Sequence, residues 1–488
     1  MEFKPSIYQQ NIKTWFDARD GKHLIVQAPA GSGKTRTGVW LIENMTEIEK
    51  HGTIFVAFNK DIAVVLRQKL APIGAVGSTY HSLGLKSIKK TYPNAKVVDG
   101  GYDKSFAILK NMLGANEKWM MPSISKLIGM CKNLLIMNPT SSDLYDLSLE
   151  YDVELFDKED NIARDRIFEV TPRALAISRD RTDLIDYDDM PSMPITDDHI
   201  SPIQYDTLLV DEVQDTNLAQ SFLAINSVTD GGTIMGIGDR RQSIYAFRGA
   251  TSGAMEQFRQ ELNAEELPLS ISYRCPTLVR DYVNKEFPDI AFETPEWAIE
   301  GTIDTISKEK IHETIVEDDM VLCRINAELV PVAFSLIRKG IKATIKGKDI
   351  GKSLVTLIKK QRADDVPDLF YNLEEFREKQ YAKFLKLDKV GKIAQLDDQI
   401  ATLDVMSEGA NSVAELITRC ETLFSDERSA VTLSTIHKAK GLEAKNVYIL
   451  RPDLLPHPMA KKPEHIAQES NLKYVAVTRT QEKLVWVV

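Results

Sequence analysis

The segment QAPAGSGKTRT, from Gln27 to Thr37, constrains the fold of this chain more than any other stretch of its sequence. It follows HLIVQA, an apolar run typical of a buried strand, and it precedes a helical pattern that begins near Lys34. A glycine-rich loop between a strand and a helix places backbone N–H groups at a helix N-terminus, where they bind phosphate. Ala28 replaces the first glycine of the usual motif. The segment predicts a nucleotide-binding loop; the alternative is a glycine-rich turn that carries an unrelated lysine.

Each residue type in this loop suits a bound triphosphate. Gly31 and Gly33 allow backbone N–H groups to close around phosphate oxygens, and Lys34 reaches the β- and γ-phosphates. The hydroxyl of Thr35 is a ligand for Mg²⁺. We therefore predict a nucleotide with Mg²⁺, and the predicted contacts of the loop are Ala28, Pro29, Ala30, Gly31, Ser32, Gly33, Lys34 and Thr35.

A second motif, LLVDEVQDTN, places Asp211 and Glu212 directly after another apolar run. Taken alone, such a pair is most often a hydrated loop after a strand. In phosphate-binding NTPases, however, a second strand ends in an acid that holds Mg²⁺, and a neighbouring carboxylate accepts a proton from the attacking water. We assign Asp211 to the metal and Glu212 to the water. Their long separation from Lys34 predicts an inserted segment.

Strand-like and helix-like segments alternate in two regions of the chain, which predicts an α/β fold with two parallel-sheet cores. At 488 residues the chain is also too long for a single core. Helical, polar stretches interrupt each region once. The predicted pieces are 1–88 and 193–268 for the first core, 89–192 for its helical insertion, 269–350 and 429–488 for the second core, and 351–428 for its small helical insertion.

The composition narrows the classes of protein that this chain can be. Its net charge of −10 argues against coating nucleic acid by bulk electrostatics, but it allows a local basic groove. The four cysteines and eight histidines show no metal-ligand spacing, so transition-metal chemistry has no support. No apolar run is long enough for a membrane span, and MEFKPSIYQQN lacks a signal-peptide core. We expect a cytoplasmic protein without membrane contact, and no partner-recruiting tail after VWVV.

Eight motifs in order resemble those of the UvrD/Rep/PcrA-like helicases of superfamily 1. They are APAGSGKT, GSTYHS, IDYDDM, DEVQD, GDRRQSIYAFRGA, SYRC, TIHKAKGLE and YVAVTRTQEKL. The resemblance covers nearly the whole chain, except that the two inserted regions match poorly. It implies two RecA-like P-loop NTPase cores, each with a mainly helical insertion, and ATP with Mg²⁺ as cofactors.

The resemblance also implies contacts to the nucleoside of ATP. Gln9 would read the adenine edge, with Gln10 as the competing assignment. Tyr273 would stack on the base. Arg36 would flank the base, and Glu443 would lie near the ribose.

Three further residues would respond to the γ-phosphate. Gln242 would sense this phosphate and pass its state to the DNA side. Arg274 and Arg479 would face it from the second core and offset the charge that develops in the transition state. The alternative for either arginine is a surface ion pair. With arginines supplied by the other core, ATP would act as a clamp that closes the cores, and hydrolysis would part them.

The DNA-binding side of the resemblance rests on aromatic residues. Tyr245 and Phe247, with Arg248 beside them, resemble the base-stacking element of the family, in which Phe247 replaces the usual tryptophan. The other predicted DNA residues are Phe58 as a second stacking position, and Tyr80, His81 and His437 as contacts to the strand backbone or links to ATP. For each aromatic residue the alternative is packing in the core.

Together these motifs predict an ATP-dependent DNA helicase or translocase, with DNA-stimulated ATP hydrolysis, that moves 3′ to 5′ on single-stranded DNA in replication, recombination or repair. The direction comes from the resemblance alone. The expected partners are single-stranded DNA, tailed duplex DNA and replication or repair proteins, and without them we expect a monomer. The short second insertion favours translocation over strand separation by the chain alone.

The alternative function is an ATP-driven DNA-binding switch without processive unwinding, which would use the same nucleotide motifs. A metabolic kinase would leave Arg274 and Arg479 unexplained.

Overall fold

The computed structural model of this chain describes residues 3–98, 101–151, 153, 155, 163–244, 253–386, 390–426 and 429–488. It divides into two compact units, Met1–Pro29 with Gly33–Ser270 and Ala30–Ser32 with Ile271–Val488. No helix in the described parts of the chain combines the length and the apolar character that a membrane span needs.

The first unit is built on a six-stranded parallel sheet with the strand order β3-β2-β6-β7-β1-β8. Its strands are β1 (Leu24–Gln27), β2 (Thr53–Ala57), β3 (Val76–Thr79), β6 (Tyr205–Asp211), β7 (Val228–Gly238) and β8 (Glu265–Pro268). The register pairs Gln27 with Gly238 and Asp211 with Ile237. The carboxyl ends of β1, β6 and β7 therefore lie together at one edge of the sheet, where ligands bind in open α/β folds.

Apolar side chains of these strands point alternately to the two faces of the sheet, and helices cover both faces. Leu209 packs on one side, whereas Leu208 and Val210 pack on the other. The first face is covered by α1 (Ile7–Asp17), α2 (Lys34–Glu43) and α4 (Lys60–Leu70), and the second by α5 (Tyr80–Thr91), α11 (Leu218–Ile225) and α12 (Ala254–Glu261). A short helix, α3 (Glu47–His51), precedes β2. Such continuous apolar strands are expected where both faces of a parallel sheet are buried.

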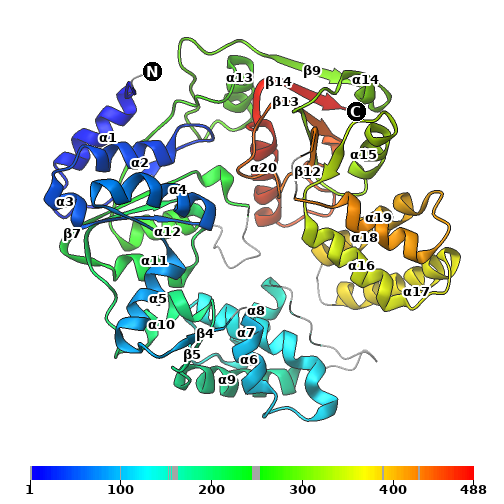
Figure 1. Ribbon diagram of the computed structural model, residues 1–488, viewed down its shortest axis with the longest axis horizontal. Coiled ribbons are helices and arrows are strands. Elements are labelled where there is room, and N and C mark those ends of the chain that lie inside the picture. Colours follow the sequence, from blue (N-terminus) through cyan, green and yellow to red (C-terminus); the bar gives the residue numbers. More distant parts are fainter. Residues whose placement is uncertain are drawn as a thin grey trace. The chain divides into compact units, whose positions relative to one another are not determined.

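The segment between β3 and β6 is mainly helical, as the sequence predicts. Its elements are β4 (Lys96–Val97), α6 (Gly101–Leu109), α7 (Met121–Asn133), α8 (Ser141–Glu150), α9 (Arg164–Asp180), β5 (Leu184–Ile185) and α10 (Asp189–Thr196). Figure 1 shows α6, α7, α8 and α9 grouped together, and they share an apolar core of their own. These four helices therefore pack into a compact helical layer with its own apolar core.

Buried ion pairs hold the IDYDDM motif against α6 and α7 of this helical segment. Lys132 of α7 lies 2.7 Å from a carboxylate oxygen of both Asp186 and Asp189, and Lys104 of α6 lies 2.7 Å from Asp189. All four side chains are almost fully buried. Removing one partner would leave an uncompensated charge in the interior, so the four groups stabilise this junction as a set.

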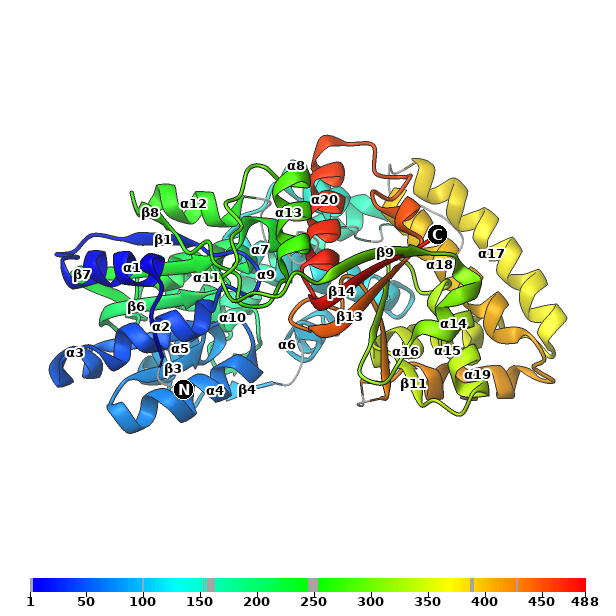
Figure 2. The same cartoon turned by 90° about the horizontal axis from the view of Figure 1, so that it is seen from above.

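The second unit contains another six-stranded parallel sheet, with the order β11-β12-β10-β13-β14-β9. The strands are β9 (Thr302–Ile306), β10 (Met320–Cys323), β11 (Ala343–Ile345), β12 (Val431–Thr435), β13 (Ala444–Leu450) and β14 (Thr480–Val487). Figure 2 shows β9, β14 and β13 side by side. The helices α13 (Thr277–Glu286), α14 (Ile311–Thr314), α15 (Leu329–Arg338) and α20 (Pro463–Val477) belong to the same unit.

Four further helices follow β11 and precede β12, so they form the insertion of the second unit. They are α16 (Lys348–Gln361), α17 (Val366–Lys386), α18 (Val390–Ser407) and α19 (Val413–Leu423). Leu354 of α16 and Leu416 of α19 share one apolar cluster with Val321 and Leu433 of the sheet. This insertion therefore extends the core of the sheet, and Figure 2 shows α17 as its long outer helix.

Candidate functional site

The loop between β1 and α2 adopts the geometry of a phosphate-binding turn. Gly31 and Gly33 have φ angles of 77° and 81°, in the left-handed region that side-chain-bearing residues rarely adopt. Gly33 is the N-cap of α2, and a Cβ there would meet nothing within 4 Å, so its backbone conformation rather than space favours glycine. Lys34 and Thr35 open α2, while Ala28, Pro29, Ala30 and Ser32 are buried.

Lys34 sits among carboxylates at the edge of the first sheet. Its Nζ lies 3.2 Å from Oε1 of Glu212, and its side chain is largely buried. Burial by itself would lower the pKa of Lys34, but the charges of Glu212, Asp239 and Asp211 outweigh it and raise the pKa above its usual value. Lys34 is therefore a permanent cation, and it offsets the negative charge of the acids that end β6.

Asp211 is fully buried beside the threonine that the sequence assigns to the metal. The hydroxyl of Thr35 donates to Oδ2 of Asp211 at 2.6 Å. Burial, together with the charge of Glu212, raises the pKa of Asp211 to about 6, against the opposing effects of Lys34 and Thr35. The ionised form of this buried carboxyl group would be stabilised by an additional positive charge close to it.

These two side chains fit Mg²⁺ in the way that phosphate-binding enzymes use it. Mg²⁺ keeps several waters and takes one or two protein oxygens together with substrate phosphates, rather than a full protein cage. Thr35 and Asp211 supply one hydroxyl and one carboxylate at one point. The described residues contain no cluster of three His, Cys, Asp or Glu side chains that could hold a metal by itself. Thr35 and Asp211 are thus the residues that would hold Mg²⁺ beside a nucleotide.

Glu212 is held in an unusual backbone conformation at the end of β6. Its φ angle is 55°, in the left-handed region, which costs a side-chain-bearing residue about 1 kcal/mol. Its N–H donates to Oδ1 of Asp211 at 3.0 Å. The amide of Gln214 donates to Oε2 of Glu212 at 2.6 Å, while Oε1 faces Lys34. Strain of this kind concentrates where a side chain must be aimed.

A chain of hydrogen bonds connects Glu212 to Gln242. Oε1 of Gln214 accepts from the N–H of Asp239 at 3.0 Å, and Oδ2 of Asp239 accepts from the Gln242 amide at 2.7 Å. Together with the bond between Gln214 and Glu212, these contacts join the predicted water-binding acid to the predicted phosphate sensor. Gln214, Asp239 and Gln242 are all buried, so the chain is shielded from water.

The sequence-based assignment missed Gln214 and Asp239. Both lie inside motifs that were recognised, DEVQD and GDRRQ, and Asp239 follows the apolar run GTIMGIG directly. That is the same signal by which Asp211 was found: an acid at the carboxyl end of a buried strand.

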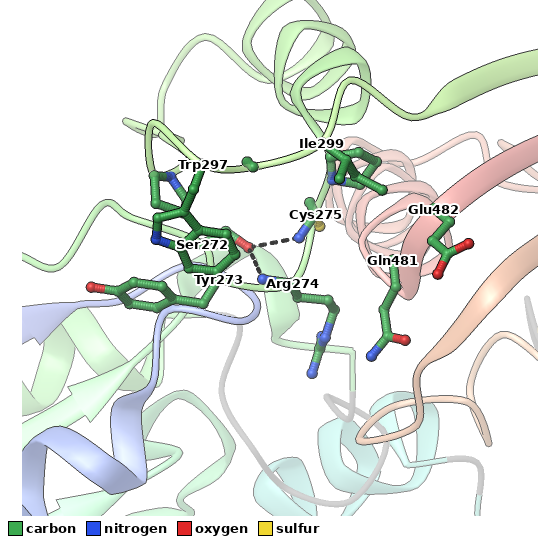
Figure 3. Close-up of a pocket in the computed structure, with 11 residues that line it drawn as sticks. Ser272, Tyr273, Arg274, Cys275, Trp297, Ile299, Gln481 and Glu482 are labelled. Atoms are coloured by element: carbon green, nitrogen blue, oxygen red, sulfur yellow. Dashed lines mark hydrogen bonds between the residues drawn. The ribbon is translucent and has the colours of Figure 1, made fainter. Parts of the chain in front are cut away.

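In the second unit, an ion pair joins two residues that the sequence predicts to act on the nucleotide, Glu443 and Arg274. Oε2 of Glu443 lies 2.6 Å from Nε of Arg274, and Oε1 accepts from the Gln481 amide at 3.0 Å. Arg274 also donates to the carbonyl of Thr478 at 3.2 Å. Figure 3 shows Arg274 and Gln481 extending in the same direction. The network orients the guanidinium while leaving Glu443 partly exposed.

Tyr273 borders a cavity of about 240 Å³ in the same unit. The cavity is lined by Ser272, Tyr273, Arg274, Cys275, Pro276, Pro295, Trp297, Ala298, Ile299, Gln481 and Glu482. Tyr273 is 40% exposed, and its ring stacks on Trp297, with ring centroids 6.4 Å apart (Figure 3). This exposed aromatic surface has the character that stacking on a base requires.

Arg479 is buried, and its guanidinium donates to backbone oxygens. Its Nε donates to the carbonyl of Val475 at 3.0 Å, and Nη1 donates to that of Leu442 at 3.2 Å. These contacts are not those of a surface ion pair, which was the alternative for this residue. The same contacts link α20 to the TIHKAKGLE motif that contains Leu442.

In this structure, the first-unit residues that are predicted to contact the nucleoside bond to other residues of the same unit. The amide of Gln9 donates to the hydroxyl of Thr37 at 2.9 Å, and its oxygen accepts from the N–H of Ser6 in a capping box. Gln10, the competing assignment, is exposed and donates to the carbonyl of Pro5. Arg36 pairs with Glu43 at 3.2 Å and remains partly exposed.

The predicted DNA-binding residues fall in three different settings. Tyr245, Phe247 and Arg248 lie outside the described residues. Phe58 is half-buried directly after β2, at the carboxyl edge of the first sheet. His437 is also half-buried, and burial together with the nearby Arg324 lowers its pKa, which keeps it neutral at physiological pH.

Tyr80 and His81 are neighbours in sequence but lie in different environments. The Tyr80 ring is 1% exposed and packs in the apolar core with Ile54 and Leu83. A direct contact with DNA would require this ring to leave the core, and packing in the core is the alternative that the sequence leaves open for this residue. His81 is half-buried and lies edge-on to Tyr187 at 5.9 Å.

Two models of known protein families match the chain. The model of the UvrD/REP helicase N-terminal domain matches residues 13–263, and that of the UvrD-like helicase C-terminal domain matches residues 155–488. The second match alone covers more than half of the chain. The chain belongs to the UvrD/Rep helicase family.

Individual members of the UvrD/Rep family show the extent of the similarity. The chain is 23% identical to ATP-dependent DNA helicase PcrA of Leuconostoc citreum over 361 residues, which cover 68% of this chain and 46% of that protein. It is 26% identical to ATP-dependent DNA helicase Rep of Buchnera aphidicola subsp. Baizongia pistaciae over 274 residues, covering 51% and 38%. It is also 26% identical to DNA helicase II of Haemophilus influenzae over 287 residues, covering 54% and 38%. The chain thus spans less than half the length of each relative.

Membership of the UvrD/Rep family confirms the predicted fold class. The two parallel sheets are the RecA-like P-loop cores of this family, and each carries a mainly helical insertion.

The raised pKa of Asp211 predicts a pH-dependent stability that Asp211→Asn should remove. A carboxyl group whose pKa is higher in the folded state stabilises the fold at low pH, and this contribution is lost as the pH rises through about 6. Without nucleotide or metal, the melting temperature of Asp211→Asn should therefore gain on that of the wild type between pH 5 and pH 8, by about 2–4 °C. Thermal unfolding across this range measures the difference.

Asp206→Asn is the matched control, because Asp206 is an exposed carboxylate near the start of the same strand. Its melting temperature should follow the wild type at every pH. A difference in melting temperature between Asp211→Asn and the wild type that stays constant from pH 5 to pH 8 would show that Asp211 makes no such pH-dependent contribution to stability.

Proposed function

We propose that this protein is an ATP-dependent DNA helicase or translocase that moves 3′ to 5′ on single-stranded DNA. The observation that carries the proposal is the meeting of Lys34, Thr35, Asp211 and Glu212 at the carboxyl edge of the first sheet. Family membership supports the use of ATP and a DNA substrate. Direction, tailed duplex as a substrate, and a role in replication, recombination or repair rest on the sequence resemblance.

In this proposal the P-loop and the acids of β6 divide the chemistry of ATP hydrolysis. Backbone N–H groups of the loop and the Lys34 ammonium bind the phosphates, while Thr35 and Asp211 would hold Mg²⁺. When bound, Mg²⁺ neutralises charge that develops on the phosphate oxygens. Glu212 accepts a proton from the attacking water, and the Gln214 amide keeps its carboxylate aimed.

The contact between Lys34 and Glu212 gives the binding step a chemical consequence. Without nucleotide, Lys34 offsets the charge of Glu212 at 3.2 Å. A triphosphate offers Lys34 a stronger anionic partner than one carboxylate, so binding frees Glu212 to take the proton of water. Glu212 therefore becomes a stronger base when the substrate arrives.

We further propose that Gln242 passes the state of the γ-phosphate toward the DNA. Gln242 ends the hydrogen-bonded chain from Glu212 and precedes the proposed stacking residues Tyr245 and Phe247 in sequence. Loss of the phosphate would change the partner of Gln242 and thereby the segment that follows it. Arg274 and Arg479 remain proposed contacts of the γ-phosphate on the strength of the resemblance.

The remaining assignments rest on family resemblance. We propose a cytoplasmic protein that is monomeric without partners and that cooperates with replication or repair proteins.

The proposed division of labour predicts different defects for two substitutions in the site. Glu212→Gln keeps the P-loop and Lys34, so it should bind ATP close to the wild-type affinity but lose about 10²- to 10⁴-fold in turnover. Lys34→Ala removes the cation that meets the phosphates and should lose both binding and turnover. Steady-state ATP hydrolysis and equilibrium binding of a fluorescent ATP analogue measure the two properties.

Glu47→Gln is the control, because it removes an exposed carboxylate from α3 of the same unit. It should hydrolyse ATP like the wild type. Wild-type turnover in Glu212→Gln would contradict the assignment of the base.

The proposed direction predicts which DNA substrates are unwound. With ATP and Mg²⁺, a duplex with a 3′ single-stranded tail should be separated, whereas a duplex with a 5′ tail should remain paired. A gel-based strand-displacement assay distinguishes them, with Glu212→Gln as the control for the requirement for hydrolysis.

Unwinding of the 5′-tailed duplex alone would reverse the proposed direction. ATP-dependent DNA binding without strand separation, and without displacement of a protein block from single-stranded DNA, would favour the DNA-binding switch instead.

A further inference from the structure

Trp297 is an exposed aromatic residue that no recognised motif contains. Trp297 is 72% exposed, although tryptophan is usually at least partly buried. It stacks on Tyr273 with a centroid distance of 6.4 Å and an interplanar angle of 26°. Both rings line the same cavity of about 240 Å³ (Figure 3). The pair thus forms one aromatic surface that lines this cavity.

The backbone around Trp297 is fastened to the segment that carries Tyr273. On one side of Trp297, the carbonyl of Glu293 accepts from the N–H of Ser272 at 2.8 Å. On its other side, the carbonyl of Ile299 accepts from the N–H of Thr277 at 2.9 Å. A turn closed by the bond from the Ala298 N–H to the Pro295 carbonyl, at 2.9 Å, places the indole between these ties. Backbone hydrogen bonds on both sides of Trp297 therefore fix the segment that carries it to the segment that carries Tyr273.

We propose that Trp297 is a positioning residue for the nucleobase of ATP. By packing on Tyr273 it fixes the plane of that ring, and the base of the bound nucleotide stacks on the plane so defined. The proposal rests on the proposed ATP site and extends it to a residue outside the family motifs. An aromatic pair in an offset-stacked arrangement is favourable beyond the area it buries, which gives Trp297 the means to restrict Tyr273.

Stacking makes this role different from recognition of the base edge. A π-face accepts any purine, whereas edge recognition depends on hydrogen bonds that distinguish adenine from guanine. Loss of Trp297 should therefore weaken the binding of ATP and the binding of GTP by the same factor. Because other residues form the phosphate site, the rate at which bound nucleotide is hydrolysed should not change.

The test is steady-state hydrolysis of Mg-ATP and Mg-GTP by the full chain with a saturating poly-dT oligonucleotide. Trp297→Ala should raise KM for both nucleotides about three- to tenfold and leave kcat within about twofold. Trp297→Phe keeps an aromatic face and should restore KM to near the wild-type value. Tyr371→Ala is the matched control, because it truncates an aromatic residue on α17 that is 67% exposed and lies outside the cavity.

A double-mutant cycle shows whether Trp297 acts through Tyr273. If it does, Tyr273→Ala with Trp297→Ala should have the KM of Tyr273→Ala alone. If the KM increase of the double variant is instead the product of the increases of the two single variants, the positioning role is overturned. An unchanged KM in Trp297→Ala, when Tyr273→Ala raises KM, would overturn it as well. An unchanged KM in Tyr273→Ala would instead refute the base site of the proposed function, and this inference with it. Thermal unfolding of each variant checks that the fold is intact.

Discussion

The compensation of buried charge at the end of β6 is the constraint on which the rest of the first unit depends. Asp211 and Glu212 are adjacent, and Asp211 is fully buried. A buried carboxylate with a second carboxylate beside it destabilises a fold unless cations and donors meet them. Lys34 provides the cation and Thr35 provides a donor, and both come from the first turn of α2. The strand register and the left-handed glycines of the loop are what bring that turn to the acids.

The charges around Asp211 favour a cationic ligand beside it. The pKa of Asp211 remains raised to about 6 even with Lys34 and Thr35 in place. A divalent cation held by Asp211 and the phosphates would supply the missing positive charge, at the cost of a proton near pH 6. The hydrogen-bonded chain through Gln214 and Asp239 then extends from the same point to Gln242. In the proposed mechanism, charge balance, proton transfer and the response to the γ-phosphate thus share one small buried region.

The sequence predicted the fold class because its strands and loops carry strong local signals. Apolar runs such as TLLVD are buried on both faces, and GSGKT requires a strand before it and a helix after it. Side-chain environments were harder to predict, because they depend on contacts between distant segments. Tyr80 follows a strand in a recognised motif, yet its ring fills the core against Ile54 of the neighbouring strand. Trp297 belongs to no recognised motif, and the backbone hydrogen bonds to Ser272 and Thr277 connect its segment to the one that carries Tyr273.

A crystal structure with Mg²⁺ and a non-hydrolysable ATP analogue tests the central claim most directly, because it shows whether the buried acids and Lys34 exchange partners when nucleotide binds. The account predicts that Nζ of Lys34 leaves Glu212, now 3.2 Å away, and contacts phosphate oxygens, with the metal bound to the Thr35 hydroxyl and to Asp211. A nucleotide bound elsewhere, with the contact between Lys34 and Glu212 intact and no metal beside Asp211, would contradict it.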